Sequence, residues 1–298
     1  MQERGHLPVM LSETLEWLQA SKGGVFLDLT LGGGGHTQAF LEAHAQNQVF
    51  AIDRDENILA QTRQKMQPFA ARFHAEHACF SEINSALQKW QIKAFDGILA
   101  DLGVSSFQLD QAERGFSFRN DGPLDMRMGR AQQSAAEWIH ETPEDEMALA
   151  FAEYGEERFA TQIAEYIALA REQQSFETTL QLADAVKKAV PPYARHGKIH
   201  PATRVFQAIR ICINQELEEL KSLLAAAPQL LKPGGRFVVL AYHSLEDRLV
   251  KNTFKQLAAE GEFALGTKRP LVPARAEILQ NRRSRSCKMR ILERNLDA

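Results

Sequence analysis

The sequence predicts an α/β protein with a mainly parallel β-sheet, into which a mostly helical segment is inserted. Three observations support this fold class. Residues 25–104 alternate short apolar runs with amphipathic segments, which is typical of successive β-α-β units. Helical patterns then dominate to about residue 190. A further apolar run at residues 236–242 indicates that the sheet resumes after the helical segment.

In the first part of the chain, four apolar runs are expected to form strands, at residues 25–29, 49–52, 72–77 and 95–102. Helices are expected to connect them, at about residues 36–45, 56–66 and 83–90. Asp55 stands where the second of these helices begins, and its carboxylate is expected to cap the free N–H groups of the first turn.

The inserted segment carries its own helix signals. Thr142 is expected to be an N-cap, because Pro143 follows at a first helical position, and Gly155 is expected to end that helix. One buried helix face is predicted from 3/4 spacing at Phe159, Ile163, Tyr166, Ile167 and Ala170. Further helices are predicted at residues 178–190 and 202–227. We therefore expect a discontinuous sheet domain (residues 1–106 and 202–298) and a helical insert (107–201).

Composition excludes several classes of protein. The 298 residues are 44% hydrophobic and 24% charged, which is typical of a globular protein rather than a disordered or fibrous one. Three widely spaced cysteines, Cys79, Cys212 and Cys287, predict a reducing, cytoplasmic location. The net charge of −3 argues against polyanion binding by bulk charge. However, residues 185–204 and 281–290 each hold five Lys or Arg and no acid, so either a local phosphate-binding face or ordinary charged surface is possible.

A run of glycines marks the predicted cofactor site. Residues 28–36 read Asp-Leu-Thr-Leu-Gly-Gly-Gly-Gly-His, between the first strand and the first helix. Glycines there allow a ligand to approach the backbone closely, at the strand ends where α/β sheets bind ligands. The GxGxxG pattern of dinucleotide-binding proteins fails in this run, which favours S-adenosylmethionine (SAM), a ligand without a pyrophosphate. Asp53, at the end of the second strand, is expected to accept hydrogen bonds from ribose hydroxyls.

Two more residues fit an adenosine pocket. Phe80 follows the third strand and could pack against adenine or serve as an ordinary core aromatic. Asp101 ends the fourth strand, where a carboxylate on an apolar strand is costly unless it has a partner, which favours a functional site. Asp101 could bind the substrate or serve mainly the cofactor. No cluster of His, Cys or Asp has the spacing of a zinc site.

Candidate substrate-binding residues lie further along the chain. His243 and Arg248 follow the last predicted strand, where His243 could orient or deprotonate a substrate and Arg248 could hold a phosphate. The alternative is a salt bridge between Asp247 and Arg248 at a helix N-terminus. His200 and Arg204 suit contact with a nucleic-acid backbone, or they form a loop-to-helix cap.

These motifs, in this order, resemble the RsmH (MraW) family of bacterial methyltransferases. The resemblance covers nearly the whole chain. It is carried by the glycine run and by the blocks at residues 6–9, 51–55, 101–110, 113–118, 122–128, 155–159, 200–204 and 243–248. The sequence departs from the family pattern at Phe107 and Arg282, where the family commonly has proline.

The resemblance implies a Rossmann-like, SAM-dependent methyltransferase domain with a helical substrate-recognition insert. It also implies methylation of the N4 amine of a cytidine in 16S rRNA, in the decoding region of the small ribosomal subunit near the P site. Residues implied to bind SAM are Gly34, Gly35, His36, Asp53, Phe80, Asp101 and Gln108. The aromatic group that stacks on the target base could be Phe107, Phe116 or Phe118.

The cysteines limit the kinds of methylation that the protein can carry out. Methylation at carbon 5 of cytosine needs a thiolate in the active-site loop, and none of the three cysteines is placed there. Radical SAM chemistry needs a closely spaced cysteine triplet, which is also missing. Direct transfer to the amine is therefore expected, with Asp101 and His243 as candidate catalytic residues. The alternatives are a methyltransferase for another substrate and a SAM-binding ribosome assembly factor without turnover. A nicotinamide-dependent oxidoreductase is disfavoured by the missing GxGxxG.

Overall fold

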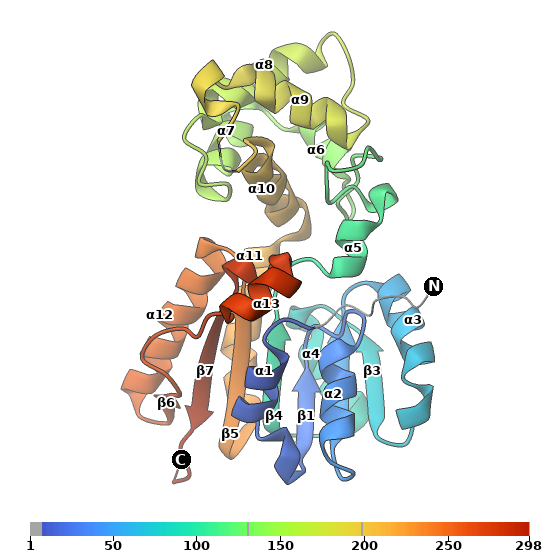
Figure 1. The fold of residues 1–298 in the computed structure, drawn as a ribbon, viewed down its shortest axis with the longest axis vertical. Coiled ribbons are helices and arrows are strands. Elements are labelled where there is room, and N and C mark those ends of the chain that lie inside the picture. The colour runs from blue at the N-terminus through green and yellow to red at the C-terminus, as the bar shows by residue number, and fades with distance from the viewer. Residues whose placement is uncertain (1–7, 130, 198, 298) are drawn as a thin grey trace. The chain divides into compact units, whose positions relative to one another are not determined.

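The computed structural model describes residues 8–129, 131–197 and 199–297, which form two compact units (Figure 1). Met1–Gly103 and Leu217–Ala298 form the first, which we call the sheet unit. Val104–Glu216 forms the second, the helical unit. His6 and Leu7 of the family-like block at residues 6–9, and Lys198 of the basic stretch, lie outside the described residues.

The sheet unit is built on seven strands in the order β3-β2-β1-β4-β5-β7-β6. The first five strands pair in parallel, and β7 runs antiparallel to both β5 and β6. The strands are β1 (Val25–Asp28), β2 (Gln48–Asp53), β3 (Phe73–His77), β4 (Phe95–Asp101), β5 (Leu231–Ala241), β6 (Phe263–Leu265) and β7 (Lys288–Arg294). All five predicted strands are confirmed, although β5 begins earlier than its apolar run. The sequence analysis did not predict β6 or β7.

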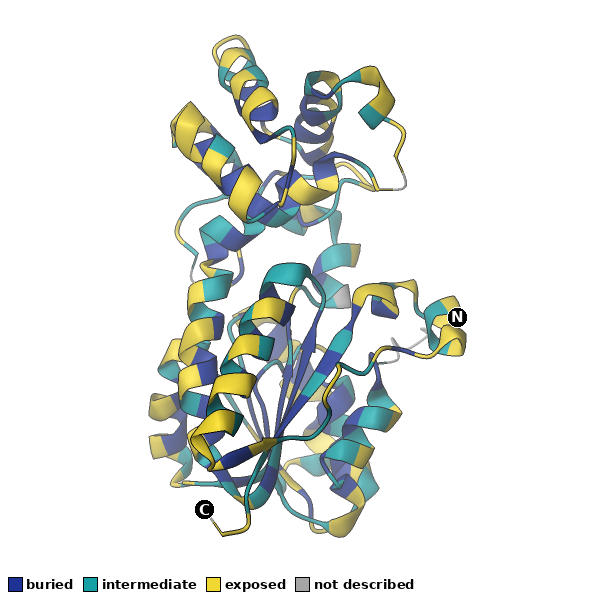
Figure 2. Ribbon diagram, turned by 90° about the vertical axis from the view of Figure 1, so that its left-hand side faces the viewer, coloured by how far each residue is buried: buried dark blue, intermediate teal, exposed yellow. Residues whose placement is uncertain are grey.

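Helices cover both faces of the sheet, which explains why the central strands β1 and β4 are buried over most of their length. Leu27 of β1 packs in one apolar cluster, together with Ile98 and Phe237. Its neighbour Phe26 packs in a second cluster, and successive side chains of a strand point to opposite faces. Figure 2 shows the buried strands between more exposed helices. The helices are α1 (Leu11–Trp17), α2 (Gly35–Ala43), α3 (Glu56–Lys65), α4 (Ile83–Trp90), α11 (Glu216–Ala226), α12 (Ser244–Glu260) and α13 (Arg275–Gln280).

The predicted start of α3 is confirmed in detail. Asp55 is its N-cap, and the carboxylate accepts hydrogen bonds from the N–H groups of Asn57 and Ile58. Asp53, two residues before this N-cap, is the last residue of β2. None of the helices that the structure describes is long and apolar enough to cross a membrane.

The helical unit has an apolar core of its own, which includes Ile163, Ile167 and Val186. Its helices are α5 (Ser106–Asp110), α6 (Ala135–Glu141), α7 (Glu144–Glu153), α8 (Ala160–Arg171), α9 (Thr179–Ala189) and α10 (Ala202–Asn214). The predicted buried face of α8 is confirmed, because Ile163 and Ile167 are buried and Phe159, Tyr166 and Ala170 pack against the core.

The predicted N-cap role of Thr142 is wrong. Thr142 ends α6, and α7 begins at Glu144 with Pro143 as its N-cap. The Arg171 guanidinium donates to the carbonyl oxygens of Ile139 and Thr142, which satisfies backbone acceptors at the end of α6. Thr142 itself is extended, the conformation that a following proline favours, so Pro143 ends α6 at this residue.

The single helix predicted over residues 202–227 is also wrong. Gln215 has φ of 51°, a left-handed conformation that cannot continue a helix, so the segment divides into α10 and α11. The buried Asn214 side chain donates to the carbonyl of Met126 and accepts from the N–H of Met128. These hydrogen bonds hold the end of α10 in the helical unit.

The break between α10 and α11 also moves the boundary between the two units. The expected insert ended at residue 201, whereas the helical unit runs from Val104 to Glu216. The reason is that Val205, Phe206 and Ile209 of α10 are buried in the core of the helical unit. Helix α10 therefore belongs to the insert rather than to the sheet unit.

Candidate active site

The glycine run forms a tight loop between β1 and α2. Gly34 is the N-cap of α2 and has φ of 73°, a conformation that favours glycine. A Cβ atom at Gly34 would lie 2.7 Å from Cγ2 of Thr62, so this position has no room for a side chain. The Thr62 hydroxyl in turn donates to the carbonyl of Gly32 over 2.6 Å. A Cβ atom at Gly33 would meet no atom within 4 Å, so this glycine borders open space.

Asp53 ties the glycine loop to the end of β2. Its Oδ2 accepts a hydrogen bond of 2.7 Å from the N–H of Gly32, and Oδ1 accepts one of 2.8 Å from the N–H of Asp55. Burial raises the pKa of this carboxyl group, and the two N–H donors partly counter that effect. The side chain keeps some exposure to solvent, so lone pairs on both oxygens can still accept donors from a ligand.

Asp101 lies at the end of β4, and its closest partner is a tyrosine. Oδ1 of Asp101 accepts a hydrogen bond of 2.6 Å from the Tyr242 hydroxyl, and its side chain remains 25% exposed. Desolvation raises the pKa of Asp101 to about 7; the Tyr242 hydrogen bond lowers it, and the negative charge of Glu246 raises it. Burial also raises the pKa of Tyr242, which keeps its hydroxyl protonated as a donor. Near neutral pH, Asp101 can therefore exist as an acid or as a base.

His36 and Asp28 form a buried layer beneath Asp101. Nε2 of His36 lies 3.1 Å from the carbonyl oxygen of Val9, which can only accept, so the ring proton sits on Nε2. Asp28 is fully buried and accepts from the Thr37 hydroxyl (2.7 Å) and the Thr30 N–H (3.1 Å). Burial lowers the pKa of His36 and raises that of Asp28. His36 is then neutral, and it contacts Asp101 as a polar neighbour at 3.7 Å.

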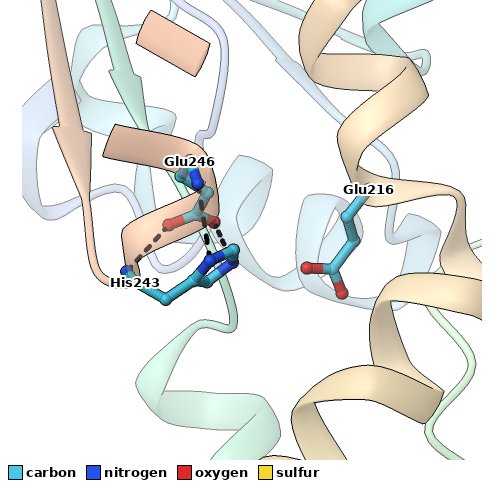
Figure 3. Close-up of side chains that lie close together, drawn as sticks. All are labelled: Glu216, His243 and Glu246. Carbon is cyan, nitrogen blue, oxygen red and sulfur yellow. Dashed lines mark hydrogen bonds and ion pairs between the residues drawn. The ribbon is translucent and has the colours of Figure 1, made fainter. Parts of the chain in front are cut away.

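His243 caps helix α12, and Figure 3 shows its imidazole against Glu246. Nδ1 accepts from the N–H of Glu246 at 3.4 Å, and Nε2 lies 3.1 Å from Glu246 Oε1. The other Glu246 oxygen accepts from the N–H groups of Tyr242 (2.8 Å) and His243 (3.3 Å). This reciprocal capping box gives His243 a structural role. The interpretation of His243 as a base therefore loses support, because its Nδ1 lone pair is occupied and its side chain is only 10% exposed.

Asp247 and Arg248 do not form the salt bridge considered above. Asp247 instead binds two basic residues of β7, with Oδ2 2.7 Å from Lys288 Nζ and Oδ1 2.7 Å from Arg290 Nε. These partners lower the pKa of Asp247 in spite of its burial. Arg248, the fifth residue of α12, has an exposed side chain. Its predicted phosphate contact stays a prediction.

The two remaining cofactor candidates, Phe80 and Gln108, lie in different units. Phe80 lies in the 3-10 helix η3 (Phe80–Glu82) directly after β3, where it is half-buried against the apolar cluster that contains Ile83. Gln108 belongs to the helical unit, and its side-chain oxygen accepts from the N–H of Ser105 as part of the α5 capping box. A cofactor contact by either residue stays a prediction.

Three predicted substrate contacts lie in the helical unit. The interpretation of Phe116 as a base-stacking group does not fit, because its ring is buried in the core of that unit. His200 accepts from the N–H of Ala202 and packs on Phe118, so the capping alternative holds for this residue. Arg204 is 45% exposed, and its guanidinium lies 3.5 Å from Glu157, which leaves it accessible to a ligand.

The model of the MraW methylase family matches residues 3–295 of this chain. The chain belongs to this family. This MraW methylase is 46% identical to a ribosomal RNA small subunit methyltransferase H from Carboxydothermus hydrogenoformans, over 98% of each chain. It is 48% identical to the protein of that name from a Synechococcus species, over 97% of this chain and 92% of the relative. A solved rRNA methylase from Streptococcus thermophilus aligns over 99% of both chains, at 12% identity and a TM-score of 0.41.

As a MraW methylase, the protein is a methyltransferase whose cofactor is S-adenosylmethionine. The residues at the sheet edge fit this cofactor. Asp53 and Asp101 end the two strands that flank β1, and both carboxyl groups accept hydrogen bonds. SAM offers hydroxyl and amino donors to such acceptors and has no phosphate that they would repel. Gly33 of the same loop borders open space, which allows the close approach that a nucleoside needs.

Two residues of the site were missed by sequence reasoning. Tyr242 directly follows β5, and in the register of the sheet Leu240 lies opposite Asp101. The pairing of β4 with β5 brings Tyr242 close to Asp101. The sequence would reveal this contact only if the order of the strands were already known. Glu246 occupies the N3 position after His243, and the His-x-x-Glu spacing is a capping-box pattern that the sequence alone contains.

Proposed function

We propose that this MraW methylase transfers a methyl group from SAM directly to the N4 amine of a cytidine in the decoding region of 16S rRNA, near the P site. The observation that carries the proposal is the identity of 46% with a ribosomal RNA small subunit methyltransferase H, over nearly the full length of both chains. Its substrate is then the RNA of the small ribosomal subunit, and its place of action is the cytoplasm.

The chemistry of the amine explains why a carboxylate such as Asp101 is needed. The lone pair of the cytosine N4 amine is delocalised into the ring, so the nitrogen is a poor nucleophile. A carboxylate that accepts one N–H of the amine can orient the nitrogen and take up its proton as the new bond forms. SAM supplies a methyl group on a sulfonium, which is already a good leaving group. Near pH 7, Asp101 can both lose and gain this proton.

Tyr242 positions the carboxyl group for this task. Its hydroxyl holds Oδ1 of Asp101 at 2.6 Å, which leaves Oδ2 to face the amine. Because the hydrogen bond stabilises the charged form, it also keeps the pKa of Asp101 from rising further. Tyr242 is in this account a positioning residue, and Asp101 is the catalytic one.

The thiols support direct transfer rather than a covalent enzyme intermediate. Burial raises the pKa of Cys212 to about 12 and also raises that of Cys287, so neither is a thiolate at neutral pH. Neither Cys212 nor Cys287 therefore provides the nucleophile that methylation of carbon 5 of cytosine requires.

We further propose that the helical unit recognises the RNA. Its basic stretch from Lys187 to Arg204 carries no acid, and Arg204 is accessible. Such a local excess of positive charge attracts phosphates even on a chain whose net charge is −3.

The proposal is tested by transfer of labelled methyl groups from SAM to purified small ribosomal subunits, with naked DNA and free cytidine as alternative acceptors. We expect label in the 16S rRNA and background levels in the other two. Label in DNA or free cytidine instead would favour a methyltransferase of another substrate. SAM binding with no transfer to any acceptor would favour an assembly factor without turnover.

A further inference from the structure

A cavity of about 330 Å³ lies in the sheet unit at the carboxyl end of β5. Residues 242–244 line one side, and residues 285–288 and Val272 line the other. Because Ala241 at the end of β5 lies opposite Lys288 at the start of β7, the two segments are neighbours in the sheet. We call this space the β5–β7 cavity.

The charges around the β5–β7 cavity leave one cation without a partner. Arg285 has an exposed side chain, and within the described residues no hydrogen bond or ion pair engages it. Lys288 is 42% exposed and shares Asp247 with Arg290. The residues that line the cavity include Arg285 and Lys288 but no aspartate or glutamate. The nearby Asp247 binds two cations, Lys288 and Arg290. The lining of the cavity is therefore positively charged.

Two further features of the wall favour an anionic ligand. Helix α12 begins at Ser244, so the positive end of its dipole faces this part of the unit. The His243 side chain, which lines the cavity, is nine-tenths buried, yet no hydrogen bond reaches its Nε2 although Glu246 Oε1 lies 3.1 Å away. A buried polar atom without a hydrogen bond at a cavity wall is typical of a group that pairs with a ligand.

The cavity is also linked to the catalytic carboxyl group. Tyr242 lines it, and the hydroxyl of the same side chain binds Asp101. A group held in the cavity is therefore separated from the Asp101 carboxyl group by one side chain, that of Tyr242. We propose that the β5–β7 cavity binds a phosphodiester of the RNA substrate close to the target nucleotide, with Arg285 as its principal ligand. This inference rests on the proposed function. It names Arg285 as a residue that contacts the backbone of the RNA substrate.

The chemistry of the wall favours a phosphate over a base. The accessible lining residues offer a guanidinium, an ammonium and the hydroxyl of Ser286, which are donors that suit phosphate oxygens. The two aromatic residues of the lining are already engaged, Tyr242 with Asp101 and His243 with Glu246. Arginine can bind two phosphate oxygens at once. An arginine that binds a phosphate contributes to affinity for any RNA sequence and makes that affinity depend on salt.

The test compares Arg285→Ala with Arg275→Ala in the full-length protein. Arg275 is an exposed arginine of α13 that does not line the cavity, so its variant removes the same charge. Three quantities are measured: the Kd for a fluorescent single-stranded RNA oligonucleotide at several salt concentrations, the KM for small ribosomal subunits, and the Kd for SAM. Inorganic phosphate is added as a competitor of the RNA in a parallel series.

We expect Arg285→Ala to raise the RNA Kd and the KM about tenfold and to reduce the slope of log Kd against log salt by about one. The SAM Kd and kcat should stay unchanged, and Arg275→Ala should change each value less than about twofold. Phosphate should compete with RNA on the wild type but hardly on Arg285→Ala.

Three results would overturn the proposal: an unchanged RNA Kd in Arg285→Ala, equal losses in both variants, or a loss of SAM affinity as large as the loss of RNA affinity. Phosphate that stabilises only the wild type against heat, while the RNA Kd does not respond to Arg285→Ala, would also overturn it and would mark a site for free anions. If RNA binding depends on Arg285 but wild-type protein transfers no methyl group to rRNA, the proposed function fails while the phosphate site stands.

Discussion

At the residue scale, three influences set the charge of Asp101. Burial and the neighbouring charge of Glu246 raise the pKa of its carboxyl group, and the hydroxyl of Tyr242 lowers it. The result, about 7, lies close to the pH of the cytoplasm, where a group that must both accept and release a proton works best. The unprotonated carboxylate is the active form, so the transfer rate should rise as pH increases through 7 and then level off.

The first prediction concerns Tyr242→Phe. Removal of the hydroxyl takes away a donor that favours the carboxylate, so the pKa of Asp101 should rise and the increase in rate should move to higher pH by about one unit. The measurement is kcat as a function of pH, with Tyr166→Phe in the helical unit as the matched control. Identical pH profiles for Tyr242→Phe and the wild type would show that the hydroxyl does not tune this carboxyl group.

The second prediction concerns Asp53→Ala. The variant loses the acceptor for ribose hydroxyls and also the two bonds that hold the Gly32 and Asp55 N–H groups. We expect SAM affinity, measured by calorimetry, to fall at least tenfold, with a loss of about 1–2 kcal/mol in stability. An unchanged SAM Kd would refute the role of Asp53 in the cofactor site.

At the element scale, the glycine loop shows how backbone conformation prepares a binding site. Asp53 and Thr62, from β2 and α3, bind the two polar backbone groups of Gly32. The loop is thus held from outside, while Gly33 faces open space. Gly34 is therefore required for the conformation of the loop, whereas Gly33 borders space that a ligand can occupy.

A pair of substitutions tests this separation. Gly34→Ala should strain a backbone at φ of 73° and bring a Cβ atom to 2.7 Å from Thr62, so we expect a lower melting temperature and at least tenfold weaker SAM binding. Gly33→Ala should leave the melting temperature unchanged, because its Cβ would meet no protein atom. Equal melting temperatures for Gly34→Ala and the wild type would contradict the geometry of the loop.

The elements that the sequence predicted correctly are those set by local pattern. The central strands β1 and β4 are apolar because both faces of the sheet are covered, and Asp55 caps α3 through its own neighbours in sequence. Two of the errors occur at segments that make distant contacts. The Asn214 side chain binds the backbone of Met126 and Met128 at the end of α10. Two cations of β7 bind Asp247, and in the sequence they look like an ordinary basic stretch. Among the candidate site residues, strand ends indicated Asp53 and Asp101, whereas Tyr242 required the strand order.

At the scale of the whole molecule, the chain forms two units with separate cores. The helical unit interrupts the sheet unit between β4 and β5. Its core residues Ile163, Ile167 and Ile209 are fully buried, and all the buried residues of their apolar cluster belong to Val104–Glu216.

We therefore expect residues 104–216, expressed alone, to fold. The fragment should give a helical circular dichroism spectrum and a cooperative thermal transition, because its core is complete without the sheet unit. It should bind no SAM, since Asp53 and Asp101 belong to the other unit. A fragment that stays unfolded would show that the sheet unit is required for the insert to fold.

The most direct test of the account is to identify the methylated atom in rRNA after reaction with the wild type and with Asp101→Asn. Small subunits are treated with each enzyme and SAM at pH 7.5, and the digested nucleosides are separated by mass spectrometry. We predict N4-methylcytidine with the wild type, and a rate at least 100-fold lower with Asp101→Asn, whose SAM affinity should remain measurable. A methyl group on carbon 5 or on another nucleoside, or full activity of Asp101→Asn, would contradict the account.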